Sequence, residues 1–229
     1  MATPLLPYIS DENLYAITKP LVTLIERTAE EEEQNMYKNT IDPFSALFDA
    51  AKQNISLTDW LNQEKSRQVQ KTLQNAIGTF HQEILGAMPG WESLPVGGII
   101  DVRSDEKKIV AEIKNKHNTT NSSSAEALYD HLSGVLNNQY AGYTAYHVQI
   151  IPKSRNEYDR LYTPSGRSPN EKIRVIDGKS FYAMASGHRD ALRMLYMVLP
   201  KVIGDIVQRS TDNVTKDTLF MLLFERAYT

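Results

Sequence analysis

Three side chains suited to phosphate chemistry lie close together in the middle of the chain. Asp101 closes one apolar segment, Glu112 interrupts a second, and Lys114 follows two residues later. Both segments are rich in β-branched residues and enclose a polar stretch, which predicts a β-hairpin. Two carboxylates on adjacent strands can bind a hard divalent cation, and a nearby lysine can stabilise negative charge. This combination suits metal-assisted hydrolysis of a phosphodiester.

The turn of the predicted hairpin decides how these side chains meet. If the turn centres on Asp105-Glu106, Asp101 lies diagonal to Glu112 on one side of the hairpin, at about 7–8 Å. Lys114 points to the same side, because side chains two residues apart share a face of a strand. Asp105 is the fallback for Asp101 as a ligand, although its simpler role is to close the turn.

A purely structural interpretation competes with the metal site. Glu-x-Lys tripeptides are common by chance, and a cross-strand salt bridge on an exposed sheet face would contain the same residues. The apolar neighbours of Glu112 favour the functional interpretation, because an ionised carboxylate among core-type residues is costly without a partner or a metal.

Asp101 followed by Glu112-Ile113-Lys114 resembles the PD-(D/E)XK nuclease motif. The longer string AEIKNKHNTTNSSS is similar to one family of type II restriction endonucleases, whose characterised members recognise GGNCC. The similarity runs from about Gly78 to about Phe181, roughly half of the chain. Ile100 stands where the motif's name has proline, a position that varies widely across this fold.

The resemblance implies an α/β fold in which a small mixed sheet is flanked by helices. It also implies Mg²⁺-dependent double-strand cuts at a short palindromic DNA site, made by a homodimer on double-stranded DNA. Asp101 and Glu112 would be the metal ligands, with Lys114 as the third catalytic residue. Glu83, on the helix before the hairpin, is a candidate for an extra metal ligand, although a solvated glutamate is the commoner case and Gln82 competes for the role.

Two further groups of residues are candidates for DNA contact. Short polar side chains with a lysine follow the catalytic strand and can bind phosphates and base edges: Asn115, Lys116, His117, Asn118, Thr119, Thr120 and Asn121. Arg167 and Arg174 are candidates for bidentate contacts to guanine. They lie in residues 153–189, where eight basic residues stand against four acidic ones although the whole chain has a net charge of -3. This local excess is compatible with a polyanion as partner.

Hydrophobic periodicity predicts a helical N-terminal part, residues 1–90, and an α/β catalytic core, residues 91–229, within one continuous domain. In the first part we expect a helix after the N-cap Ser10, a short one after Pro43 and a long one from Ser56 to about Met88. Beyond the hairpin we expect a series of elements: a helix over 124–137, a strand over 143–151, a loop over 155–170, strands over 172–176 and 180–184, and helices over 189–208 and 217–227.

Several classes of protein are disfavoured. The chain has no cysteine, so disulfides and thiolate metal sites are excluded and the cytoplasm is the expected compartment. The five histidines lack zinc-ligand spacing, no glycine-rich phosphate loop suggests a nucleotide cofactor, and no apolar run suggests a membrane. Two alternatives to a restriction endonuclease stay open: a repair or structure-specific nuclease, and a non-catalytic helical interaction protein.

Overall fold

The computed structural model describes residues 3–35, 41–95, 97–117 and 122–228, with only the backbone described for 26–35 and 122. Within these residues, six strands form one sheet in the order β1-β2-β3-β4-β6-β5. The strands are β1 (Glu92–Ser93), β2 (Val102–Ser104), β3 (Ile109–Lys116), β4 (Thr144–Ile151), β5 (Asp159–Leu161) and β6 (Ile173–Asp177). β3, β4 and β6 run parallel at the centre, while β1, β2 and β5 complete the edges in antiparallel pairs. The predicted α/β class with a mixed sheet is confirmed.

The sheet separates two apolar cores. Odd-numbered residues of β3, such as Ala111 and Ile113, pack with Ile84 and Phe181 in the larger core. Val110 lies in the smaller core on the other face. The two faces therefore receive alternate side chains of the same strand, as the pleat of a strand requires.

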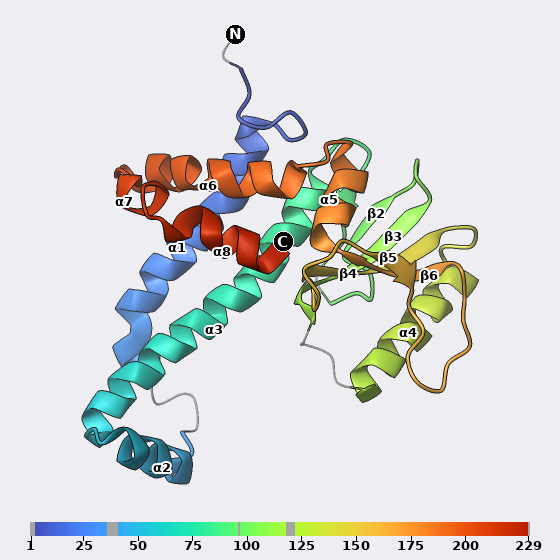
Figure 1. Cartoon of the computed structure of the whole chain (residues 1–229). Helices are drawn as coiled ribbons and strands as arrows, with labels where there is room; N and C mark the ends of the chain where they lie inside the picture. The colour runs from blue at the N-terminus through green and yellow to red at the C-terminus, as the bar shows by residue number, and fades with distance from the viewer. Residues whose placement is uncertain (1–2, 36–40, 96, 118–121, 229) are drawn as a thin grey trace.

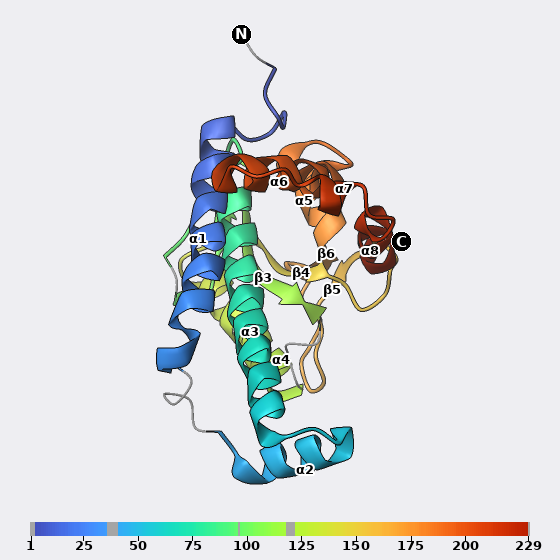
Figure 2. The same ribbon diagram turned by 90° about the vertical axis from the view of Figure 1, so that its left-hand side faces the viewer.

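The N-terminal helices form an arm that leads away from the sheet. Helices α1 (Asp11–Asn35) and α3 (Leu57–Gly86) lie side by side, and α2 (Pro43–Gln53) sits at the far end of the arm (Figures 1 and 2). Asp42 and Ser56 cap α2 and α3, each accepting a hydrogen bond from a backbone N–H of the first turn. The three predicted N-terminal helices are confirmed. Leu14 and Ile84 share the larger core with sheet residues, so the arm is continuous with the body of the protein.

Five helices belong to the C-terminal part that the structure describes. Helix α4 (Ser122–Asn137) covers the face of the smaller core, while α5 (Gly178–Ser186), α6 (Ala191–Val207) and α8 (Leu219–Tyr228) lie on the other side of the sheet, with the short α7 (Asp212–Thr215) between α6 and α8 (Figure 1). In the described residues, no helix is both long and apolar enough to cross a bilayer.

The strand predicted over 180–184 is wrong, because this segment lies in α5. Asp177 caps the helix by accepting a hydrogen bond from the Ser180 N–H at 3.0 Å, and Gly187 ends it at a positive φ of 75°. Asp177-Gly178 is therefore the start of a helix. The loop predicted over 155–170 also needs correction, since it contains the edge strand β5.

Candidate active site

Glu112 and Lys114 project from the central strand β3 toward the face that α4 covers. They follow Val110 at intervals of two, and Val110 belongs to the core beneath α4. Because β3 is paired with β2 on one side and β4 on the other, its backbone is held from both edges. The two side chains thus project from a strand that is paired on both sides.

Asp101 meets them from the start of β2, in a register that differs from the predicted one. The turn spans residues 105–108 and β2 pairs with β3 so that Val102 faces Ala111. The Asp101 N–H donates to the Ala111 carbonyl at 2.9 Å, so Asp101 and Val102 both lie against Ala111 and the ladder is irregular at this point. Asp101 Oδ2 accepts a hydrogen bond of 2.6 Å from the Ile113 N–H, which holds the carboxylate against β3 beside Glu112.

The electrostatics of Asp101 favour a cation beside it. Burial raises the pKa of Asp101 to about 6, and the negative charge of Glu112 adds to the rise, while the Ile113 N–H and Lys114 oppose it. Two carboxylates in a poorly solvated site repel one another, and a bound cation would relieve that repulsion.

Glu112 is buried but has two partners. Lys114 Nζ forms an ion pair with Oε1, and His147 Nδ1 lies 3.1 Å from Oε2. Burial raises the pKa of Glu112, but the hydrogen bond from His147 and the charge of Lys114 outweigh it, so the net pKa is lowered. Glu112 is therefore a carboxylate at neutral pH, as a metal ligand must be.

The donor set suits magnesium. Mg²⁺ prefers oxygen ligands, keeps several waters and is commonly bound through one or two carboxylates together with substrate phosphates. Asp101 and Glu112 supply two carboxylates, and among the described residues no group of three or more acidic, histidine or cysteine side chains forms a fuller cage. The residues present therefore fit a hydrated hard cation that shares its coordination with a phosphate.

Comparison with known proteins shows to which family the chain belongs. The model of the Eco47II restriction endonuclease family matches residues 6–208. The chain belongs to this family. The type II restriction enzyme Eco47II of Escherichia coli is 40% identical over 212 residues, which cover 89% of this chain and 88% of that enzyme. The type II restriction enzyme Sau96I of Staphylococcus aureus is 33% identical over 240 residues, covering 99% of this chain and 91% of that enzyme. No solved structure matches the chain significantly.

The protein is thus a type II restriction endonuclease, a site-specific deoxyribonuclease. Because the chain belongs to this family, the restriction endonuclease is favoured over the two alternatives that the sequence left open, a repair nuclease and a non-catalytic interaction protein. It also confirms the resemblance carried by Asp101, Glu112 and Lys114 at the level of the family.

On the helix before the hairpin, Gln82 and not Glu83 contacts the backbone of Asp101. Gln82 is buried and its Nε2 donates to the backbone oxygens of Leu94 and Asp101 at 2.8 and 3.2 Å. Glu83, one residue further round α3, is exposed to solvent. The structure therefore does not bring Glu83 to the carboxylates, whereas Gln82 holds the backbone of Asp101 in place.

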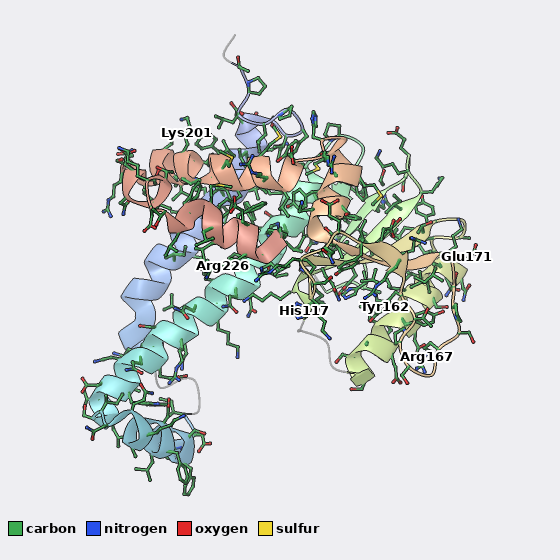
Figure 3. The ribbon with its side chains drawn as sticks, in the orientation of Figure 1. His117, Tyr162, Arg167, Glu171, Lys201 and Arg226 are labelled. Carbon is green, nitrogen blue, oxygen red and sulfur yellow. The ribbon has the colours of Figure 1, made fainter. Side chains whose placement is uncertain are left out.

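The polar segment after the catalytic strand is only partly described. Asn118, Thr119, Thr120 and Asn121 lie outside the described residues. Asn115 and Lys116 line an apolar hollow of about 740 Å³ bordered by α1, α3, α6 and α8. His117 borders a different hollow, close to the catalytic strand, and lies on the side of the sheet where α4 is (Figure 3).

The structure does not bring Arg167 and Arg174 to the carboxylates. Arg167 forms a two-pronged ion pair with Asp130 of α4, with both N–O distances at 2.7 Å, and lies beside that helix in Figure 3. Arg174 pairs with Asp159 at 2.6 Å and stands on the sheet face opposite to Glu112, since its register partner is Tyr146 and not His147. In the DNA-free protein both guanidinium groups pair with carboxylates of the same chain, and their contacts to guanine stay a prediction.

Sequence reasoning missed a set of polar residues beyond the catalytic strand. A hollow of about 470 Å³ is lined by His117, Gln149, Lys153, Ser154, Tyr158 and Arg160. Gln149 is the register partner of Lys114, so this hollow adjoins the catalytic face. A signal was available, because His147 and Gln149 alternate with apolar residues in the predicted strand 143–151, which marks a polar stripe on one face.

Proposed function

We propose that this type II restriction endonuclease cuts both strands of duplex DNA at a short palindromic site of the GGNCC kind, as a Mg²⁺-dependent homodimer. The convergence of Asp101, Glu112 and Lys114 on the central strand is the observation that supports metal-dependent cleavage. The recognition site is inferred from the resemblance of the segment around Glu112 to the family whose characterised members recognise GGNCC.

Each side chain of the proposed metal site would have a separate role. Asp101 and Glu112 would hold Mg²⁺, which supplies charge stabilisation at the scissile phosphate and lowers the pKa of an attacking water. Lys114, now paired with Glu112, is the cation best placed to orient that water or to stabilise the developing negative charge. Gln82 fixes the backbone that carries Asp101, and His147 contacts the far oxygen of Glu112.

Cleavage of a plasmid tests the proposal directly. With Mg²⁺ we expect discrete fragments whose sequenced ends map to GGNCC, and no cleavage when EDTA removes the metal. A plasmid in which every such site has been altered is the matched substrate control and should stay intact. Fragment ends at an unrelated or asymmetric sequence would refute the recognition site while leaving the nuclease intact.

DNA binding should depend on salt and on the hollow beside the catalytic face. Lys153 and Arg160 line this hollow with His117, and both are exposed. Each phosphate bound by a cationic side chain releases counterions, so the slope of log affinity against log salt becomes shallower by about 1 for each such cation removed. Lys153→Ala combined with Arg160→Ala should therefore weaken binding of all sequences alike and reduce the slope by about 2.

Fluorescence anisotropy with specific and non-specific duplexes in Ca²⁺, over a range of salt, measures this slope. Lys201→Ala combined with Lys216→Ala is a matched control, because these lysines lie on α6 and just after α7 and each pairs with an aspartate four residues away. A wild-type affinity that does not change between low and physiological salt would contradict a phosphate-binding surface.

We infer a homodimer from the number of candidate active sites in one chain. The described part of one chain holds a single cluster of this kind, and the two strands of DNA run in opposite directions, so two copies related by a twofold axis can cut both. A candidate contact is α2, where Phe44 and Phe48 are 71% and 75% exposed at the end of the arm (Figure 1). Exposed apolar patches of this kind commonly mark protein interfaces.

Replacing both phenylalanines of α2 with serine should shift the endonuclease from dimer to monomer in sedimentation analysis. Thermal unfolding of the monomer should change little, because these side chains bury little surface within one chain. Val214→Ser, at a position that is 47% exposed on α7, is the matched control and should leave the dimer intact. A wild-type protein that is monomeric even on its DNA site would overturn the homodimer, and a dimeric double variant would place the interface elsewhere.

A further inference from the structure

A buried histidine stands directly behind Glu112. His147 is 1% exposed and is the register partner of Glu112 on the neighbouring strand β4. Its Nδ1 lies 3.1 Å from Glu112 Oε2. Lys114 contacts the other oxygen, Oε1, so the two partners take opposite sides of one carboxylate.

The neighbours of His147 fix which nitrogen donates. An ionised carboxylate only accepts hydrogen bonds, so Nδ1 must carry a hydrogen toward Glu112. On the other side of the ring, Gln149 Nε2 lies 3.1 Å from His147 Nε2, and Tyr158 donates its hydroxyl to Gln149 Oε1 at 2.6 Å. Because the Gln149 oxygen is occupied by Tyr158, its amide N–H faces His147 Nε2, which accepts.

This chain of hydrogen bonds is anchored at its far end. Burial raises the pKa of Tyr158 to about 12, so the hydroxyl keeps its proton at neutral pH. The Tyr158 backbone N–H donates to Asp177 Oδ2 at 2.7 Å, and Asp177 is itself buried at the start of α5. The ring of Tyr162 packs with its centroid 5.1 Å from that of His147, which restricts rotation of the imidazole.

We propose that His147 is a positioning residue of the metal site, acting through Glu112. Its Nδ1–H holds Oε2 and leaves Oε1, which Lys114 contacts, as the oxygen that would bind a cation, while Gln149 and Tyr158 keep the imidazole in the donating tautomer. This inference rests on the proposed metal site. Partners that orient a ligand in this way commonly change metal affinity by about 10- to 100-fold when they are removed.

The test compares two replacements of His147. His147→Leu removes the donor and keeps an apolar side chain of similar bulk, whereas His147→Asn keeps an N–H near the position of Nδ1. We expect His147→Leu to weaken Mn²⁺ binding by the free protein, followed by the EPR signal of unbound Mn²⁺, by about 10- to 100-fold. His147→Asn should recover most of that loss, which a merely space-filling role of the imidazole would not produce.

Two more variants keep the test informative. Gln149→Leu, at a half-buried position, should give a smaller loss of Mn²⁺ affinity in the same direction and serves if His147→Leu does not fold. His131→Leu, at an exposed position on α4, is the matched control and should bind Mn²⁺ as the wild type does.

The result for Glu112→Gln separates the two proposals. If it loses Mn²⁺ binding while folded His147→Leu or Gln149→Leu binds normally, the positioning role is overturned and the metal site stands. If Glu112→Gln itself binds Mn²⁺ with wild-type affinity, the metal site fails, and the role of His147 fails with it.

Discussion

Glu112→Gln, Asp101→Asn and Lys114→Ala should each reduce DNA cleavage by roughly 100- to 1,000-fold or more, because each removes a charge that acts on the scissile phosphate. DNA binding in Ca²⁺ should survive, since most of the affinity comes from phosphate and base contacts elsewhere. Loss of negative charge at Asp101 or Glu112 can even strengthen it. Cleavage rates, binding and thermal unfolding of the three variants provide the measurement.

Asp101→Asn has an additional expected result that a structural salt bridge would not give. The folded-state pKa of Asp101 is raised to about 6, mainly by burial, so its ionised form opposes folding above that pH. Replacing it with a neutral amide should leave the metal-free protein at least as stable as the wild type at pH 7–8. Glu106→Gln and Lys107→Ala, both exposed in the turn of the same hairpin, are the controls and should cleave normally. Wild-type cleavage by folded Glu112→Gln would refute the role of Glu112 as a metal ligand.

Gly178→Ala should destabilise the fold by on the order of 3 kcal/mol, a large effect for one methyl group. A Cβ at this position would lie 2.7 Å from Ile150 Cα and closer still to the Ile150 carbonyl oxygen, so it would collide with the backbone of β4. The start of α5 and the middle of the sheet cannot both stay in place. For a chain of this size the expected fall in melting temperature is roughly 6–12 °C.

Gly78→Ala is the matched control, and its expected effect on stability has the opposite sign. Gly78 lies inside α3, and a Cβ there would meet nothing within 4 Å. Alanine favours a helix over glycine, so this variant should gain up to about 1 kcal/mol. Equal melting temperatures for the two variants would contradict the close approach of α5 to β4.

The candidate catalytic residues could be singled out from the sequence because the pattern that marks them is local. A carboxylate inside an apolar strand, a second at the end of its partner strand and a lysine two residues on are visible without any tertiary information. The predicted register of the hairpin was wrong because the turn extends to Lys108, a residue other than glycine that adopts a positive φ of 54°. The sequence does not indicate that a lysine adopts the left-handed backbone conformation. The predicted turn was therefore shorter than the observed one.

Residues that depend on distant partners were harder to predict. Arg167 and Arg174 have the right type for guanine contacts, but only the fold shows that Asp130 and Asp159 lie beside them. Glu83 and Gln82 could not be separated, because one residue on a helix turns the side chain by about 100° and the phase of a long helix is hard to fix from periodicity alone. His147 was visible as a polar residue in a strand, yet its partner Glu112 is 35 positions away.

The hydrogen bond from the Ile113 N–H to Asp101 gives the endonuclease a built-in spectroscopic reporter. Most amides of a central strand donate to backbone carbonyls and are indifferent to the ionic state of an active site. This amide donates to a carboxylate oxygen at 2.6 Å, so its proton resonance depends on the charge of that group. In a ¹⁵N–¹H spectrum, one cross-peak from a residue that takes no part in the chemistry would follow the state of Asp101. Occupancy of the site could then be observed in ¹⁵N-labelled protein without a substrate or a turnover.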